Sequence, residues 1–202
     1  HYKTPVTNCL DIGTGTGLLS LMVAQKSTAT IDALEIDQQA YQQAKENFES
    51  SLWNNRLTVH HTDALNFNAK KKYDLIFSNP PFFGNDLKSE NEQKNAAKHD
   101  ITLTLEQLLQ IIDANLLSDG SFAILLPYHR VDIFIADANK IGFYVEEKVL
   151  VKQTPTHNYF RGILLFSRKE TAINSTSFSI KNKENQYTEK FIELLKDYYL
   201  HL

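Results

Sequence analysis

The chain has 202 residues, of which 42% are hydrophobic and 22% charged, as is usual for a globular domain with a buried core. Its net charge of −3 and isoelectric point near 6.2 do not favour a protein with an overall basic field; Lys70–Lys72 are a local basic cluster that we interpret as a solvated loop, and Lys88, Lys94 and Lys98 form a sparser one. No apolar run approaches the roughly 20 residues that span a bilayer. The single cysteine, Cys9, excludes a disulfide framework and indicates a reducing cytoplasm.

Strand and helix patterns alternate through the first two thirds of the chain. Residues 8–12, 31–37, 57–63, 72–78 and 121–127 have the composition of buried strands, and residues 18–26, 38–50, 103–120 and 130–142 have that of helices. A polar stretch to about residue 99 follows the fourth strand and is typical of a loop. Two further strands at 143–151 and 159–169, a polar connector at 171–187 and a terminal helix at 188–200 complete the order.

Strict alternation of strands and helices predicts a mostly parallel sheet with helices on both faces. The last two strands are joined by the short segment TPTHN, so the final strand must pair antiparallel. We therefore expect residues 1–202 to form a single α/β domain with a seven-stranded sheet.

A glycine-rich turn follows the first strand in the segment DIGTGTG. Gly13, Gly15 and Gly17 allow a tight turn and close approach of a ligand to the backbone. A dinucleotide fingerprint would need its third glycine at position 18, which is Leu18, and the phosphate-loop pattern is also absent. The spacing favours a nucleotide site of another kind.

Acidic residues end the second and third strands. Glu35 lies about 20 residues past the glycine turn, where α/β nucleotide binders accept hydrogen bonds from a ribose. Asp37 fits a helix N-cap, and Asp63 is placed to accept an exocyclic amine of adenine. His60 and His61 point to opposite faces and have no second ligand pair, so we expect no metal site.

The motifs DIGTGTG, LEID, HTDAL and SNPPF occur in the order and spacing of a known enzyme class. In this respect the chain resembles the class I S-adenosylmethionine (SAM)-dependent methyltransferases, and NPPF resembles the motif of the branch that methylates planar amino nitrogens. The resemblance implies a Rossmann-like fold and SAM as the cofactor. The cofactor-binding residues that it implies are Asp11, Gly13, Gly15, Gly17, Glu35, Ile36, Asp63, Ala64 and Asn79.

Asn79, Pro80 and Phe82 are the catalytic candidates. The Asn79 side-chain oxygen and the Pro80 carbonyl are suited to accept both hydrogens of an amine, which frees the nitrogen lone pair and stabilises the charge that develops there. The two prolines fix the backbone and remove competing N–H donors. The Phe82 ring is suited to stack on a flipped base.

Segments outside these motifs, including W-x-x-R-L-T-V-H, ILLFS and the closing YYL, are similar to a family of bacterial methyltransferases that modify the adenine beside the anticodon of a valine tRNA. We therefore expect the anticodon loop of a tRNA as partner, a cytoplasmic location, no membrane, and a monomer in preference to an oligomer. Family members begin with an extra N-terminal segment, which we expect this chain to lack.

Three alternatives remain open at this point. The acceptor of the same chemistry is a protein glutamine amide or a guanine N2 in ribosomal RNA; the domain binds SAM or RNA without catalysis; or it is a dinucleotide oxidoreductase, which the glycine spacing disfavours.

Overall fold

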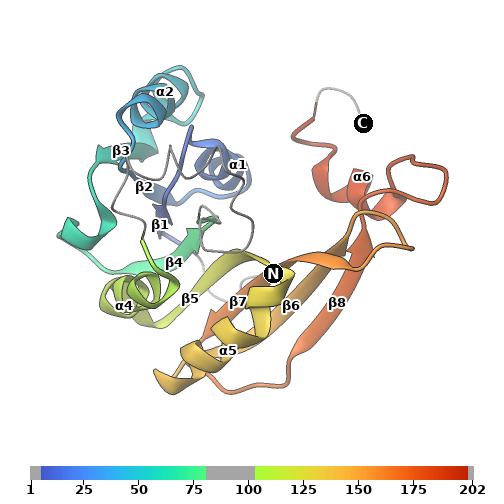
Figure 1. Cartoon of the computed structure of the whole chain (residues 1–202). Coiled ribbons are helices and arrows are strands. Elements are labelled where there is room, and N and C mark those ends of the chain that lie inside the picture. The colour runs from blue at the N-terminus through green and yellow to red at the C-terminus, as the bar shows by residue number, and fades with distance from the viewer. Residues whose placement is uncertain (1–5, 81–102, 200–202) are drawn as a thin grey trace, which may run out of the picture.

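The computed structural model describes residues 6–80 and 103–199, which form one eight-stranded sheet with helices on both faces (Figure 1). The order of the strands across the sheet is β3-β2-β1-β4-β5-β7-β6-β8. The strands are β1 (Asn8–Ile12), β2 (Thr30–Glu35), β3 (Leu57–His61), β4 (Tyr73–Ser78), β5 (Leu116–Pro127), β6 (Tyr144–Lys152), β7 (Tyr159–Ser167) and β8 (Asn174–Ser179). The helices are α1 (Leu18–Lys26), α2 (Gln38–Glu49), α4 (Leu105–Asn115), α5 (Val131–Lys140) and α6 (Glu189–Leu195), with short 3-10 turns η1 (Asn54–Arg56), η2 (Ala64–Asn66) and η3 (Tyr128–Arg130).

The pairing confirms the predicted mostly parallel sheet with an antiparallel β7. Strands β1 to β5 pair in parallel, whereas β7 runs antiparallel to both of its neighbours, β5 and β6. Strand β6 is consequently parallel to β5, and its end at Lys152 lies at the same edge of the sheet as the ends of β1 to β5.

The predicted number of seven strands is wrong, because β8 adds an eighth. This strand lies inside residues 171–187, which we predicted as a polar connector, and it pairs in parallel with β6 from Asn174 opposite Glu147 to Ser179 opposite Lys152. Its sequence NSTSFS holds one large apolar side chain, Phe178, and its residues are exposed or half-buried. Backbone pairing with β6 forms this strand, and such pairing leaves no hydrophobic alternation in the sequence.

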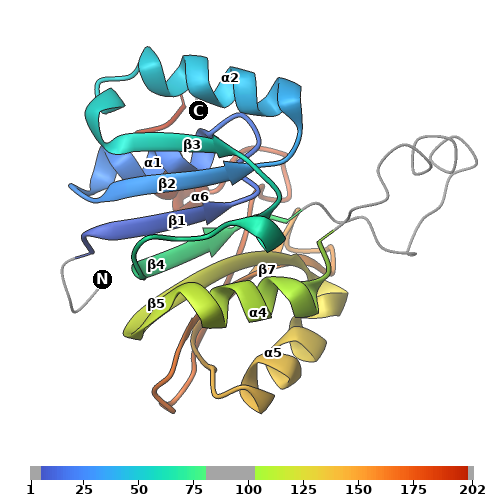
Figure 2. The same cartoon turned by 90° about the vertical axis from the view of Figure 1, so that its left-hand side faces the viewer.

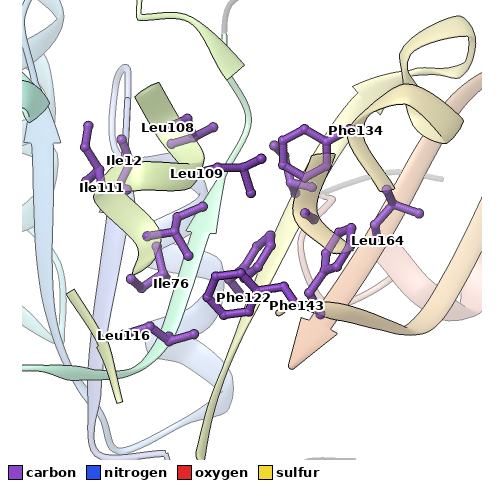
Figure 3. Packing of buried hydrophobic residues seen from close by; sticks show 14 of the residues in the cluster. Ile12, Ile76, Leu108, Leu109, Ile111, Leu116, Phe122, Phe134, Phe143 and Leu164 are labelled. Carbon is purple, nitrogen blue, oxygen red and sulfur yellow. The ribbon is translucent and has the colours of Figure 1, made fainter. Parts of the chain in front are cut away.

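The core on one face of the sheet lies beneath α4 and α5 and contains most of the buried aromatic rings (Figure 3). Phe122 of β5 stacks on Phe166 of β7 with the ring centroids 4.6 Å apart, and Phe143 meets Phe122 edge-on at 5.1 Å. Phe134 of α5 completes the group with an edge contact to Phe166 at 5.6 Å. Because each ring is fully buried, this group fixes α5 against β5 and β7.

The opposite face is covered by α1 and α2, so that the sheet lies between two helical layers (Figure 2). Most of this core comes from the strands, and Phe48 of α2 is its largest helical contribution. Asp37 caps α2 as predicted, since its side chain accepts hydrogen bonds from the backbone N–H groups of Gln39 and Ala40.

Helix α4 ends at Asn115 and not at Gly120, the last residue of the predicted helix. Leu116 already has an extended backbone and pairs with Tyr73, and the register then shifts so that Ser121 lies opposite Leu75. A Cβ atom on Gly120 would lie 3.0 Å from the Asp74 carbonyl oxygen and from the Leu116 side chain. Gly120 therefore permits close approach within an irregular strand.

The terminal helix is shorter than predicted and lies largely in solvent. Thr188 caps α6 by accepting from the Phe191 N–H, and the helix ends at Leu195. None of its residues is buried, and Leu194 is 46% exposed. After the helix, Asp197 forms an ion pair with Lys26 of α1. Among residues 6–80 and 103–199, no helix has the length and apolar character needed to cross a bilayer.

Candidate active site

The predicted site residues come together where the parallel strands β1 to β4 end. Ile12 of β1 pairs with Leu34 of β2 and with Ser78 of β4, and Glu35 of β2 pairs with His61 of β3. The segments that follow these four strands therefore lie side by side at one edge of the sheet. Ligands of open α/β sheets bind at this edge.

The glycine turn adopts a left-handed backbone at each of its three glycines. Gly13, Gly15 and Gly17 have φ angles of 75°, 59° and 87°. At Gly13 and Gly15 no atom of the described residues, apart from the glycine and its chain neighbours, lies within 4 Å of the position that a Cβ would take. At Gly17 a Cβ would lie only 2.5 Å from Cε1 of Phe48. Gly17 is thus required for packing of α2 against the start of α1, whereas Gly13 and Gly15 leave room for a ligand.

Asp11 anchors this turn from inside the core. Its Oδ2 accepts hydrogen bonds from the hydroxyls of Thr14 at 2.6 Å and Ser20 at 2.7 Å. Its Oδ1 is buried and has no hydrogen-bond partner within the described parts of the chain. Burial raises the pKa of Asp11 to about 6, opposed by the two hydroxyl hydrogen bonds and assisted by the nearby charge of Glu35. A buried acceptor without a donor is costly, so this oxygen is suited to receive a donor from a ligand.

Glu35, 8% exposed, accepts three backbone hydrogen bonds. Its Oε1 accepts from the N–H groups of Ile36 and Asp37, both at 2.8 Å, and its Oε2 accepts from Gly15 N–H at 2.7 Å. A carboxylate has about four acceptor positions, so a single one remains on Oε2. The backbone thus satisfies most of this buried carboxylate. For both hydroxyls of a ribose to bind, the bond from Gly15 has to open.

Three further predicted cofactor-binding residues, Ile36, Asp63 and Ala64, follow β2 and β3 near the same carboxylate. Ile36 is 48% exposed next to Glu35. The segment after β3 is tied to β2 by a hydrogen bond of 2.9 Å from Thr62 N–H to the Glu35 carbonyl. Asp63 caps η2, which begins at Ala64: its Oδ1 accepts from Leu65 N–H at 2.9 Å. Asp63 thus has a local structural role, and its role at the adenine stays a prediction.

Asn79 and Pro80 follow β4 directly beside the glycine turn. The Ser78 hydroxyl donates a hydrogen bond of 2.7 Å to the Ile12 carbonyl and is buried, so the end of β4 is fixed to the end of β1. Asn79 is exposed and Pro80 is buried. Phe82, the predicted stacking ring, lies outside the described residues, as does the stretch from 84 to 100.

Sequence reasoning missed the residues that hold the site together from beneath. Thr14, Ser20 and Ser78 are buried hydroxyls that bind Asp11 or the Ile12 carbonyl. The available signal was their polarity within apolar segments that flank the glycine turn and the NPPF motif, since a buried hydroxyl needs a partner. No group of three or more potential metal ligands occurs within residues 6–80 and 103–199.

Comparison with known proteins gives concordant matches. Residues 2–113 match the methyltransferase small domain family. A protein of Flavobacterium psychrophilum named tRNA1(Val) (adenine(37)-N6)-methyltransferase is 38% identical over 194 residues, which cover 95% of this chain and 83% of the relative. A protein of the same name from Dyadobacter fermentans is 41% identical over 196 residues, with 95% and 82% covered.

Solved structures support the same fold at low sequence identity. The crystal structure of a predicted O-methyltransferase from Agrobacterium tumefaciens superposes with a TM-score of 0.67 at 17% identity, covering 95% of this chain and 88% of that one. A glycopeptide N-methyltransferase in complex with SAM superposes with a TM-score of 0.61 at 11% identity, covering 83% and 90%.

Proposed function

The chain belongs to the methyltransferase small domain family and, within it, to the group of tRNA1(Val) (adenine(37)-N6)-methyltransferases. From this premise we propose that it methylates N6 of the adenine beside the anticodon of a valine tRNA. The observation that carries the chemistry is the position of Asn79 and Pro80 directly beside the glycine turn, where Ser78 fixes β4 to β1.

The residues at this edge fit SAM, which supplies an electrophilic methyl group when it is bound. The free acceptor position of Glu35 suits a ribose hydroxyl, and the unpartnered Oδ1 of Asp11 suits a donor group. The open space at Gly13 and Gly15 leaves room for the ligand against the backbone. In this assignment Ile36, Asp63 and Ala64 border the adenine, and Gly17 acts through packing against Phe48.

Asn79 and Pro80 act on the amine that receives the methyl group. An adenine amine is a weak nucleophile because its lone pair is delocalised into the ring. The Asn79 side-chain oxygen and the Pro80 carbonyl accept its two hydrogens, which draws the nitrogen toward tetrahedral geometry and stabilises its developing positive charge. N6 gains the methyl group and loses one proton. Because Pro80 has no N–H and a fixed φ, the carbonyl is held in place without a competing donor.

The test is methyl transfer from labelled SAM to unmodified total tRNA, followed by digestion and detection of N6-methyladenosine. Ribosomal RNA and a protein extract are incubated in parallel as sources of guanine N2 and glutamine amide. Label on adenine N6 of valine tRNA is the expected result. Label only in ribosomal RNA or protein would refute the assigned substrate.

An Asn79→Ala variant tests the role of the side chain. We expect its rate to fall by about two or more orders of magnitude, as is usual when one transition-state hydrogen-bond partner is removed. Its affinity for the RNA and its melting temperature are expected to stay near those of the wild type, because Asn79 is exposed. Asn139→Ala, at an exposed asparagine of α5, is the matched control. Turnover of Asn79→Ala equal to that of the control would refute the role.

A further inference from the structure

One segment of this acidic chain carries a clear excess of positive charge. Residues 148–183 contain seven Lys or Arg and one Glu, a net charge of +6, whereas the whole chain carries −3. The segment covers most of β6, all of β7 and β8, and the turns between them. Such an asymmetry is the electrostatic footprint expected of a polyanion-binding surface.

Part of this charge meets aromatic rings at the edge of the sheet where the active site lies. Lys152, at the end of β6, pairs with Tyr159 at the start of β7, and its Nζ lies 4.7 Å from the centre of the Tyr159 ring. The Tyr159 ring in turn contacts the Tyr128 ring of η3, with centroids 5.4 Å apart. Tyr128 is 41% exposed. This arrangement joins the turn after β5 to the end of β6.

A second pair of a lysine and an aromatic ring lies next to this group, toward the terminal helix. Backbone hydrogen bonds of 2.9 Å from Ile180 to the Lys152 carbonyl and from Lys181 to the Gln153 carbonyl place the chain after β8 next to the end of β6. The Lys181 Nζ lies 5.5 Å from the centre of the Tyr187 ring, and Tyr187 is 40% exposed. We call Tyr128, Tyr159, Lys152, Lys181 and Tyr187 the basic aromatic edge.

The basic aromatic edge is continuous with the candidate active site. Ser78 of β4 pairs with Ile124 of β5, and β5 then runs only to Pro127 before Tyr128 begins η3. Tyr128 therefore lies at the same edge of the sheet as Asn79, and β6, β8 and α6 extend from there to one side of the molecule (Figure 1). Within residues 6–80 and 103–199, neither Lys152 nor Lys181 forms an ion pair with a carboxylate.

Aromatic rings and ammonium groups gathered along one edge match the chemistry of an unpaired nucleic-acid strand. Bases stack on aromatic faces without regard to sequence, and lysines bind the phosphates between them. An ammonium over a ring keeps three N–H donors, so Lys152 and Lys181 still have donors for phosphate oxygens. The half-exposed Tyr128 ring offers a face for a base. The Tyr187 ring is already stacked on Phe191, with the centroids 4.9 Å apart, and so supports the position of Lys181.

We propose that the basic aromatic edge binds single-stranded RNA that flanks the methylated base. In the tRNA substrate, the bound nucleotides are those of the anticodon loop. This assignment to the anticodon loop rests on the proposed function. The edge supplies affinity and holds the loop in register, while Asn79 and Pro80 act on the base itself.

The first test measures binding of fluorescent valine tRNA and of single-stranded oligouridine to Lys152→Ala/Lys181→Ala. We expect affinity for both RNAs to fall about tenfold and the slope of log Kd against log salt to drop by about 1.4, since each lost phosphate contact on a single strand removes about 0.7. The SAM affinity and the melting temperature are expected to stay at wild-type values. Lys70→Ala/Lys72→Ala removes the same charge from the turn before β4 and is the matched control.

The second test separates stacking from charge at Tyr128. Tyr128→Ala is expected to weaken RNA binding at least about fivefold, whereas Tyr128→Phe, which keeps the ring, is expected to bind like the wild type. Equal weakening by the control lysine pair and the edge pair, or an unchanged Kd in the edge variants, would overturn the proposal. A wild-type protein that binds neither RNA would overturn it as well. A wild-type protein that binds oligouridine through this edge but methylates no tRNA would refute only the proposed function.

Discussion

Asp11 offers a quantitative test of the site, because its charge is held in the core at a cost that depends on pH. The perturbation is Asp11→Asn, which keeps the size of the side chain and an oxygen for Thr14 and Ser20 but removes the charge. Burial raises the pKa of Asp11 from 3.8 to about 6. The folded protein therefore holds the Asp11 proton more tightly than the unfolded chain does.

The sign and size of the effect follow from this difference. The contribution of Asp11 to the free energy of unfolding is therefore greatest below pH 3.8 and is lost as the pH rises to about 6. Above that pH it no longer changes. The whole difference corresponds to about 3 kcal/mol, at about 1.4 kcal/mol for each pH unit. Between pH 5 and pH 8 the free energy of unfolding of the wild type should fall by about 1.5 kcal/mol relative to the variant.

The assay is urea unfolding of both proteins, without cofactor, at several pH values between these two. Any fixed cost of placing an amide in the core shifts all points equally, so the change with pH is the informative quantity. A difference between variant and wild type that stays constant from pH 5 to pH 8 would refute the conclusion that Asp11 is a buried, charged group at neutral pH. The same variant should bind SAM more weakly, because an amide NH2 group takes the place of the unpartnered Oδ1 and the charged acceptor is lost.

Three further perturbations address the glycine turn, the acidic strand end and the buried thiol. Gly17→Ala should lower the free energy of unfolding by about 2–4 kcal/mol, because the alanine has a strained left-handed backbone and clashes with Phe48. Gly13→Ala has the backbone strain but no clash, so it should lower the free energy of unfolding by only about 1–2 kcal/mol. Equal losses in urea unfolding would contradict the packing role of Gly17. Glu35→Gln should weaken SAM binding about tenfold or more in a calorimetric titration, because the charge of the acceptor is lost. Its melting temperature should change little, because the amide oxygen still accepts from Ile36 and Asp37. Unchanged affinity would contradict the role of Glu35 in the cofactor site. Burial, assisted by Asp74 and Asp11, raises the pKa of Cys9 to about 12, so a thiol reagent at pH 8 should label Cys9 only after unfolding, and rapid labelling of the folded protein would contradict its burial.

The sheet and most of its elements were predictable because periodicity reports burial on one or two faces. Strands β1 to β5 are apolar runs between helices, and their parallel order followed from that alternation. The end of α4 was not predictable in this way: Leu116 and Leu117 continue the apolar helical pattern, and only pairing with Tyr73 makes the chain extended there. The exposed β8 likewise depends on a partner strand distant in sequence.

The candidate site divides along the same line. Positions at strand ends, such as Glu35 and Asn79, were accessible from spacing, because the ends of parallel strands share one edge. The hydrogen bonds of Glu35 were not, since they come from backbone N–H groups that every sequence contains. The basic aromatic edge was missed because the overall charge of −3 conceals a segment of +6, although a charge count in windows along the chain would have revealed it.

The bond between Gly15 N–H and Glu35 Oε2 gives the turn a latch that has consequences for turnover. A ribose whose two hydroxyls occupy both acceptor positions of Oε2 displaces the hydrogen bond from Gly15 N–H each time it binds. This bond, the latch, forms again when the product nucleoside leaves. Exchange of one bond for another lowers the net gain of binding, which favours rapid departure of product over tight retention. The Gly15 amide is consequently a natural spectroscopic reporter: its proton resonance follows the latch, and with it each arrival and departure at the site.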